Sequence, residues 1–212
     1  MKLSELAYQR FKEDLFGGRV KPGQFVSQRE LVRLTGVSLA PMREALLKLE
    51  AEGLVQLVPQ RGIQVAEASL KMIRNAFQLR MIVEKEAVRL FVESAAEAEI
   101  VALLESHEEV LAQARLGIGQ ALLERAQTTD WRLHDTLVAC LGNELVSDIH
   151  RVNSDRIRLI RLDHGLLTAA NLASAMEEHL AILEACRRRE PEAAAAAVER
   201  HLSTAMRRAM GV

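Results

Sequence analysis

Three histidines and one aspartate form the pattern in this sequence that most clearly suggests chemistry. Asp130 and His134 are four residues apart, so their side chains share one face of a helix. His179 and His201 follow later, each among regularly spaced apolar residues, and two neighbouring antiparallel helices would bring both to the depth of the first pair. Neutral imidazoles with one carboxylate suit a divalent metal ion, Zn or Ni rather than Mg. On a six-coordinate ion, such a set leaves two positions for water or a bidentate acid.

The alternative for each of these histidines is a purely structural role, because a histidine on a helix is more often a core or surface residue than a ligand. That structural role is assigned to the remaining histidines, His107, His150 and His164. His164 precedes a glycine and is expected to interact with the dipole at a helix end.

An arginine interrupts an apolar stripe in the first long helix of the C-terminal part. The stripe consists of Ile73, Phe77, Arg80, Glu84, Val88 and Phe91. A guanidinium in such a stripe needs an anion. That anion is either Glu84, one turn away, or the carboxylate of a small organic acid bound in a helical cavity, and both interpretations stay open.

These side chains must be positioned by a long helical region that begins near Ser69. The period of its apolar residues predicts six helices, over residues 70–95, 97–115, 118–140, 143–164, 169–189 and 191–209. The predicted breaks fall at Ser94–Ala95, Gly117, Gly142–Asn143, Gly165 and Pro191. Amphipathic helices with such short connections indicate an antiparallel bundle.

The first 66 residues have shorter elements separated by tight turns. A first helix ends at Gly17–Gly18, and a capping box from Ser27 to Glu30 begins a second helix that ends at Gly36. Ser38 is expected to cap a third helix with Pro41 in its first turn. Two apolar segments, 54–58 and 63–65, flank a turn and predict a β-hairpin. The order predicts a winged helix-turn-helix, whose third helix enters the major groove of DNA.

Composition narrows the class of protein. The 212 residues are 49% hydrophobic, 27% charged and 3% aromatic, which is typical of a globular chain and argues against an aromatic ligand cage. We expect a soluble, cytoplasmic protein, because no apolar run approaches the ~20 residues of a membrane span. Charged residues in every turn of the N-terminal segment also argue against a signal peptide. Cys140 and Cys186 lack the spacing of a thiolate zinc site.

The charge of the chain is divided unevenly. Residues 1–66 hold ten basic and seven acidic side chains, a net charge of +3, which leaves −4 for the remainder. We therefore predict a DNA-binding domain over 1–66, a linker over 67–72 and a separate helical domain over 73–212.

The N-terminal motif resembles the DNA-binding region of GntR-family regulators. The resemblance lies in PGQFVSQRELVRLTGVSLAPMREALLKLEAEGLV (22–55) and PQRGIQV (59–65). The remainder is similar to the FadR-type C-terminal (FCD) effector domain, marked by D-x3-H, a later E-H and a final H-L. Here these are Asp130/His134, Glu178–His179 and His201–Leu202. Six helices instead of seven are more similar to the VanR-like branch.

The resemblance implies specific residues for each role. The DNA-binding set comprises Arg29, Ser38, Ala40, Pro41, Arg43, Lys48, Arg61 and Gly62. Leu39 departs from the arginine that the family usually has there, so the operator preference can differ. The resemblance also supports the metal ligands Asp130, His134, His179 and His201, and Arg80 as an effector contact.

The expected function is therefore that of a homodimeric transcriptional regulator, and not an enzyme. It would repress transcription at a near-palindromic double-stranded DNA operator until a small carboxylate binds at the metal. Two alternatives stay open: a metal-dependent hydrolase fused to a DNA-binding region, and a regulator whose metal is only structural. Against the hydrolase, no general base is evident; Asp135 and Glu178 are merely near the ligands in sequence.

Overall fold

The computed structural model describes residues 2–164 and 167–211, so the break predicted at Gly165 lies outside the described residues. Its contacts divide the chain into two compact units. The first comprises Met1–Ile73 and Ser154–His164, and the second comprises Arg74–Asn153 and Gly165–Val212. This division differs from the predicted domain over 73–212, because residues 154–164 pack with the N-terminal elements.

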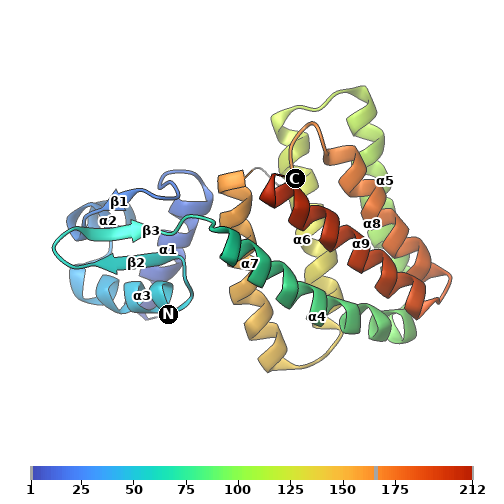
Figure 1. The fold of residues 1–212 in the computed structure, drawn as a ribbon, viewed down its shortest axis with the longest axis horizontal. Coiled ribbons are helices and arrows are strands. Elements are labelled where there is room, and N and C mark those ends of the chain that lie inside the picture. The colour runs from blue at the N-terminus through green and yellow to red at the C-terminus, as the bar shows by residue number, and fades with distance from the viewer. Residues whose placement is uncertain (1, 165–166, 212) are drawn as a thin grey trace. The chain divides into compact units, whose positions relative to one another are not determined.

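The first unit is a winged helix-turn-helix (Figure 1). Its elements are α1 (Leu3–Phe16), β1 (Phe25–Val26), α2 (Gln28–Thr35), α3 (Leu39–Ala51), β2 (Val55–Val58) and β3 (Gly62–Val65). The antiparallel sheet has the order β1-β3-β2, and Val55 pairs with Val65 while Val58 pairs with Gly62. The predicted hairpin is thus confirmed, and β1 is an additional strand that the sequence analysis did not predict.

The starts of α2 and α3 differ in their capping. Ser27 accepts a hydrogen bond from the backbone nitrogen of Glu30 at 3.2 Å, as the capping box predicts. Ser38 occupies the N-cap position of α3, but its side chain makes no capping hydrogen bond. The third residue of α3 is Pro41, which has no N–H to donate. The predicted side-chain cap is therefore wrong, although the helix begins where expected.

A helix from the C-terminal part of the sequence completes the core of the first unit. That core contains Tyr8, Phe11, Leu31, Met42, Leu46, Leu49 and Ile63, together with Leu159. Asp155 forms an ion pair with Lys12, and the Nε of Arg156 donates to the backbone oxygen of Glu52 at 2.9 Å. These contacts explain why residues 154–164 belong to this unit.

The second unit is a bundle of helices whose bounds lie close to those predicted. Within the described residues these are α4 (Leu70–Ser94), α5 (Glu97–Leu116), α6 (Gln120–Ala139), α7 (Glu144–His164), α8 (Leu172–Arg187) and α9 (Pro191–Met210), of which α4 and α7 extend into the first unit (Figure 1). α8 packs against α5, α6 and α9. The largest apolar core includes Val88, Phe91, Leu103, Leu133, Leu137, Ile182, Leu183, Val198 and Leu202.

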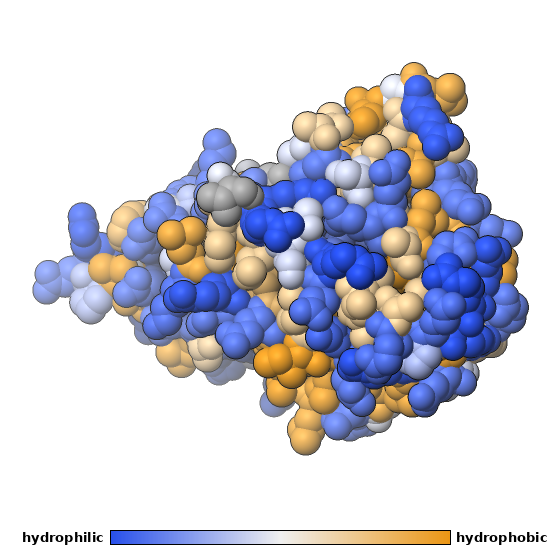
Figure 2. Space-filling view, turned by 45° about the vertical axis from the view of Figure 1, so that its right-hand side comes forward, coloured by the Kyte–Doolittle hydropathy of each residue, from blue (hydrophilic) through white to orange (hydrophobic). Residues whose placement is uncertain are grey.

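The face drawn in Figure 2 is more polar than apolar. Figure 2 shows hydrophilic side chains over much of the visible face, with apolar residues in smaller groups between them. Among the described residues, no helix combines the length and apolarity needed to cross a membrane.

Candidate metal centre and nucleic-acid interface

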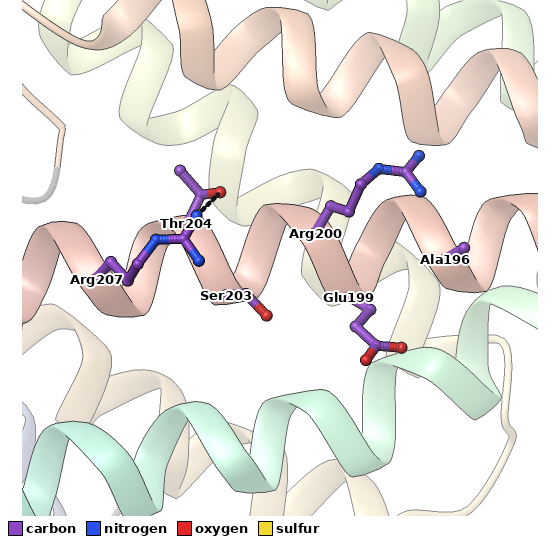
Figure 3. Close-up of a pocket in the computed structure, with 6 residues that line it drawn as sticks. All are labelled: Ala196, Glu199, Arg200, Ser203, Thr204 and Arg207. Atoms are coloured by element: carbon purple, nitrogen blue, oxygen red, sulfur yellow. Dashed lines mark hydrogen bonds between the residues drawn. The ribbon is translucent and has the colours of Figure 1, made fainter.

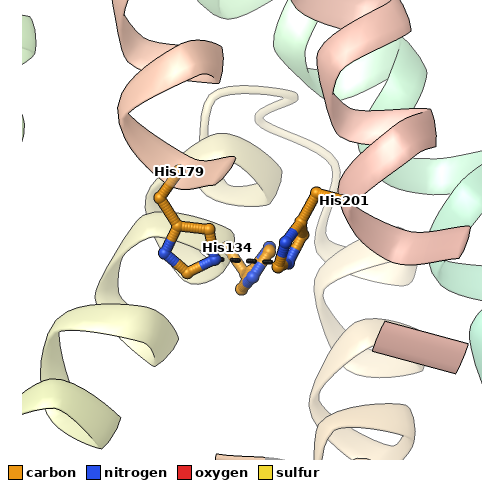
Figure 4. A group of neighbouring side chains, drawn as sticks. All are labelled: His134, His179 and His201. Carbon is orange, nitrogen blue, oxygen red and sulfur yellow. Dashed lines mark hydrogen bonds between the residues drawn. The ribbon is translucent and has the colours of Figure 1, made fainter. Parts of the chain in front are cut away.

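Three imidazoles from three helices converge inside the bundle (Figure 4). His134 belongs to α6, His179 to α8 and His201 to α9, and one ring nitrogen from each lies within 4.8 Å of the others. The Nε2 atoms of His179 and His201 are 3.2 Å apart. All three side chains are buried, with exposed fractions of 0–4%. Separate apolar stripes on α6, α8 and α9 thus direct one histidine each to a common point.

The carboxylate of Asp130 lies beside this cluster. Asp130 precedes His134 by one turn of α6 and is buried. Its Oδ1 atom is 3.6 Å from the Nε2 of His179. The three predicted histidines therefore converge, and the fourth predicted ligand, Asp130, lies beside them without belonging to the group whose ligand atoms are all within 4.8 Å of one another.

Two further carboxylates fix the orientation of the imidazoles. The Oε2 of Glu84 on α4 lies 2.6 Å from the Nδ1 of His134, and the Oε2 of Glu178 on α8 lies 2.8 Å from the Nδ1 of His201. A carboxylate that accepts from Nδ1–H leaves the lone pair on Nε2, which is the tautomer that a metal requires. Among residues 2–164 and 167–211, the buried Nε2 of His134 has no hydrogen-bond partner.

Burial favours the neutral form of two histidines of the cluster, His134 and His179. It lowers the pKa of His134 and lowers the pKa of His179 still further, and neighbouring positive charges add to both effects. Burial by itself would raise the pKa of Glu84, but Arg80 and His134 together hold that pKa well below its usual value. Neutral imidazoles beside an ionised carboxylate are the protonation states of a metal site. The donor set, its burial and the unpartnered Nε2 of His134 thus fit a divalent ion.

Arg80 forms the internal ion pair that was one of its two possible roles. Its Nε donates to the Oε1 of Glu84 at 2.6 Å, and both side chains are buried. Arg80, Glu84 and His134 are therefore linked in series. Within the described part of the chain, the Nη2 of Arg80 is buried without a hydrogen-bond acceptor. One donor of the guanidinium is thus satisfied, while the donor Nη2 remains.

The sequence analysis missed three neighbours of the cluster. Glu84 was considered only as a partner of Arg80, and His107 only as a structural residue. Glu178 was considered as a candidate base and as part of the E-H motif, but not as a partner of His201. His107 lies on α5 at 0% exposure, and the centroid of its ring is 5.2 Å from that of His179. The available signal was the position of His107 within the apolar stripe Ile100, Leu103, Leu104 and Val110 of α5.

The two carboxylates considered as a hydrolytic base have other partners. Asp135 is exposed and lies 2.9 Å from the Nε2 of His150. Glu178 bonds to His201 and accepts from the Nη2 of Arg208 at 2.7 Å. Neither carboxylate is therefore a free general base beside the histidines.

A surface hollow of about 510 Å³ lies along another face of α9 (Figure 3). Its lining residues are Ala196, Glu199, Arg200, Ser203, Thr204 and Arg207. They share a face by their helical spacing and do not include His201. The hollow is therefore distinct from the histidine cluster.

Most of the predicted DNA-binding residues of the first unit are exposed. Arg29, Ser38, Ala40, Arg43 and Arg61 all present exposed side chains, and so does Leu39. The Nε and Nη2 atoms of Arg43 each lie 3.4 Å from the Oε1 of Gln28, which connects the starts of α2 and α3. These helix starts therefore carry adjacent polar groups that can reach a phosphate or a base edge.

The hairpin turn has a backbone that favours glycine. Gly62 has a φ of 102°, and a Cβ placed there would lie 3.1 Å from the backbone oxygen of Val26. Arg61, beside it, is exposed and lies over the ring of Phe25 with its Cζ 5.4 Å from the centroid. The turn thus presents an arginine at the tip of the wing.

Lys48 and Pro41 are placed differently from the other members of the predicted set. The Nζ of Lys48 is 3.2 Å from the Oε2 of Glu5 and 3.8 Å from the centroid of the Tyr8 ring, so its charge faces α1. Pro41 is half-buried in the first turn of α3.

The two units match two known domain families. Residues 3–65 match the bacterial regulatory proteins of the gntR family, and residues 75–204 match the FCD domain. The second match alone spans more than half of the chain.

Named relatives are regulators. The chain is 27% identical to the HTH-type transcriptional repressor RspR of Escherichia coli K12, over 94% of this chain and 86% of that protein. It is 28% identical to the HTH-type transcriptional repressor NanR of Citrobacter rodentium, over 96% of this chain and 84% of that one.

Solved structures show the same fold. A transcriptional regulator GntR from Rhodococcus sp. RHA1 superposes with a TM-score of 0.81 at 18% identity, covering 99% of this chain and 98% of that one. The Zn2+-bound FCD domain of TM0439 superposes with a TM-score of 0.55 at 21% identity, covering 68% of this chain and 94% of that domain. The chain therefore belongs to the GntR family of bacterial regulatory proteins, as a transcriptional regulator with an FCD domain and not an enzyme.

Proposed function

We propose that this protein is a metal-dependent transcriptional repressor that a small carboxylate releases from its operator. The observation that carries the proposal is the buried convergence of three imidazole nitrogens within 4.8 Å, with Asp130 beside them. Relatives named as repressors, RspR and NanR, support the direction of regulation. The Zn2+-bound FCD domain of TM0439 supports a divalent ion, with Zn or Ni as the proposed metal.

Asp130, His134, His179 and His201 would hold the ion. Glu84 and Glu178 orient two of the imidazoles by accepting from their Nδ1–H groups. Such outer carboxylates raise the basicity of a ligating imidazole and fix its ring. A bound divalent ion supplies a positive centre to which a carboxylate can coordinate.

Arg80 is the proposed second contact for the acid. Its Nη2 is a buried donor without an acceptor in the described residues, and a carboxylate oxygen forms a strong, charge-assisted hydrogen bond with a guanidinium. The Nε of the same group is held by Glu84, so the direction of the guanidinium is fixed before any acid binds. The low aromatic content favours small aliphatic mono- or dicarboxylates over aromatic acids.

For DNA, we propose a homodimer in the cytoplasm that binds a near-palindromic operator. Two copies related by a twofold axis impose the same symmetry on their half-sites. The exposed arginines Arg29, Arg43 and Arg61 would contact the duplex, together with Ser38, Ala40 and the backbone of Gly62. Pro41 and Lys48 complete the proposed set of DNA contacts. To contact DNA, Lys48 would have to leave Glu5. Release by the acid requires that it bind the DNA-incompetent state more tightly.

The experiment first identifies an operator: DNA fragments that the purified protein binds are enriched and sequenced. Fluorescence anisotropy then gives the Kd for this operator with and without zinc and a panel of small carboxylates. We expect one or more acids to weaken operator binding by the zinc-loaded wild type. We expect no acid to change operator binding by His179→Ala. If the acids leave operator binding unchanged while zinc still binds, the metal is structural and the proposed effector control is wrong.

A further inference from the structure

We propose that His107 is a positioning residue for the metal centre and accepts a hydrogen bond from the Nδ1–H of His179. This inference rests on the proposed metal site and names a residue outside its ligand set. His107 lies on α5 and does not belong to the group whose ligand atoms lie within 4.8 Å of one another. Its role would be to hold one ligand in the tautomer that binds the ion.

The tautomer of His107 is determined by its own backbone contact. Its Nδ1 lies 2.7 Å from the backbone oxygen of Leu103. A carbonyl oxygen can only accept, so Nδ1 carries the proton of the neutral ring and Nε2 carries the lone pair. His107 therefore offers a hydrogen-bond acceptor inside the bundle.

His179 has the complementary requirement. His134 and His201 each donate Nδ1–H to a carboxylate, but within residues 2–164 and 167–211 the Nδ1 of His179 is buried and has no partner. A metal-binding imidazole that coordinates through Nε2 carries its proton on Nδ1, and this proton nearly always has an acceptor. His179 is thus the one imidazole of the described cluster that lacks this outer partner.

The two unpartnered nitrogens belong to rings that touch. The rings of His107 and His179 meet edge to face, with centroids 5.2 Å apart and planes at 78°. In that part of the chain which the structure describes, the Nε2 of His107 is buried and also without a partner. The two nitrogens do not hydrogen-bond to each other in the described structure, so the proposed bond would form when His179 takes up its metal-binding tautomer.

The position of a single proton on His179 follows from this arrangement. Without an ion, the Nε2 of His179 can donate to the Nε2 of His201, 3.2 Å away. When Nε2 instead becomes a ligand, the ring still holds one proton, which must move through solvent exchange to Nδ1. The Nε2 of His107 then accepts a hydrogen bond from this Nδ1–H, and the proton stays on His179. The cost of burying an unsatisfied N–H is thus avoided in the metal-binding tautomer.

The zinc affinity of the full chain, measured by competition with a chromogenic chelator, tests the proposal. His107→Phe keeps a ring but removes the acceptor, and should weaken zinc binding by about 10–100-fold. His107→Gln supplies an amide oxygen as acceptor and should recover most of that loss. The matched control is Val110→Ala, which removes buried volume one turn along α5 and should leave zinc affinity unchanged.

Nitrogen NMR of the histidine rings keeps the proposal testable if His107→Phe does not fold. Zinc-loaded wild type should show a slowly exchanging proton on the Nδ1 of His179. A rapidly exchanging proton there, or equal zinc affinity of His107→Phe and wild type, would overturn the role of His107 alone. Wild type that binds no zinc would overturn the metal site itself, and this role with it.

Discussion

The Nε2 atoms of His179 and His201 face each other at 3.2 Å across two adjacent helices, α8 and α9. Glu178 accepts from the Nδ1 of His201, so the Nε2 of His201 carries a lone pair. This lone pair needs either a proton from His179 or a cation. The same atoms can therefore close the bundle core without an ion or bind one.

Zinc should raise the stability of the wild-type protein. An ion that binds only the folded state adds about 2.7 kcal/mol at a free concentration 100 times Kd. Thermal unfolding of chelator-treated and zinc-loaded protein measures this gain, which should disappear in His179→Ala. Ser203→Ala, on another face of α9, is the control that should keep it. An equal gain in His179→Ala would show that zinc acts elsewhere.

Substitution of Arg80 should separate its two roles. Arg80→Ala leaves Glu84 buried without its cation and should cost about 3–5 kcal/mol of unfolding free energy. Arg80→Lys keeps a positive charge but loses the planar fork, so it should weaken carboxylate binding while retaining the metal. Calorimetric titration of zinc-loaded protein with small acids measures this effect. If Arg80→Lys bound the acids as tightly as wild type, the guanidinium fork would not be part of the effector site.

Operator binding should depend more on Arg43 than on Lys48. Arg43 is exposed at the start of α3, and Arg43→Ala should cost about 1–3 kcal/mol of specific binding. Lys48 already interacts with Glu5 and Tyr8, so Lys48→Ala should cost less. Gel-shift titrations of both variants and of Arg29→Ala provide the comparison. Unchanged affinity for both Arg29→Ala and Arg43→Ala would contradict the docking of α2 and α3 on DNA.

Acid should destabilise the metal-free protein. The pKa values of His134 and His179 are lowered in the folded state, chiefly by burial, whereas in the unfolded chain they return to about 6.5. Below this pH the unfolded state binds more protons, so stability falls as pH decreases. Denaturant unfolding between pH 8 and 5 should show this slope, and a shallower slope in His179→Phe. An identical slope in that variant would contradict the buried, neutral state of His179.

The two cysteines should differ in reactivity. Burial raises the pKa of Cys186 to about 12, so almost none of its thiolate exists at pH 8. Cys140 is only partly buried. A chromogenic disulfide reagent should therefore modify one thiol per folded chain and two after unfolding. Rapid modification of two thiols in the folded protein would show that the core around Cys186 opens.

Helix boundaries were largely predictable, because apolar periodicity and glycine or proline punctuation are local properties. The bounds of α4 to α9 lie within a few residues of the predicted ones. β1 was not predictable in this way, since two residues are too few to show an alternating pattern. The capping bond of Ser38 was wrongly expected because the effect of Pro41, three residues later, was not considered.

The candidate site was predictable in part. A spacing of four residues placed Asp130 beside His134 on one helix. The bond between Glu84 and His134 joins positions 50 residues apart, and it depends on how α4 and α6 are rotated against each other. The same holds for His107 and His179 on α5 and α8. Spacing within one helix carries no information about such rotations.

Zinc stoichiometry tests the central claim most directly. Protein loaded with zinc, passed over a gel-filtration column and analysed for metal should retain about one ion per chain. The triple variant His134→Ala, His179→Ala, His201→Ala should retain almost none. Wild type without bound zinc, or a triple variant that retains as much zinc as wild type, would contradict the metal centre.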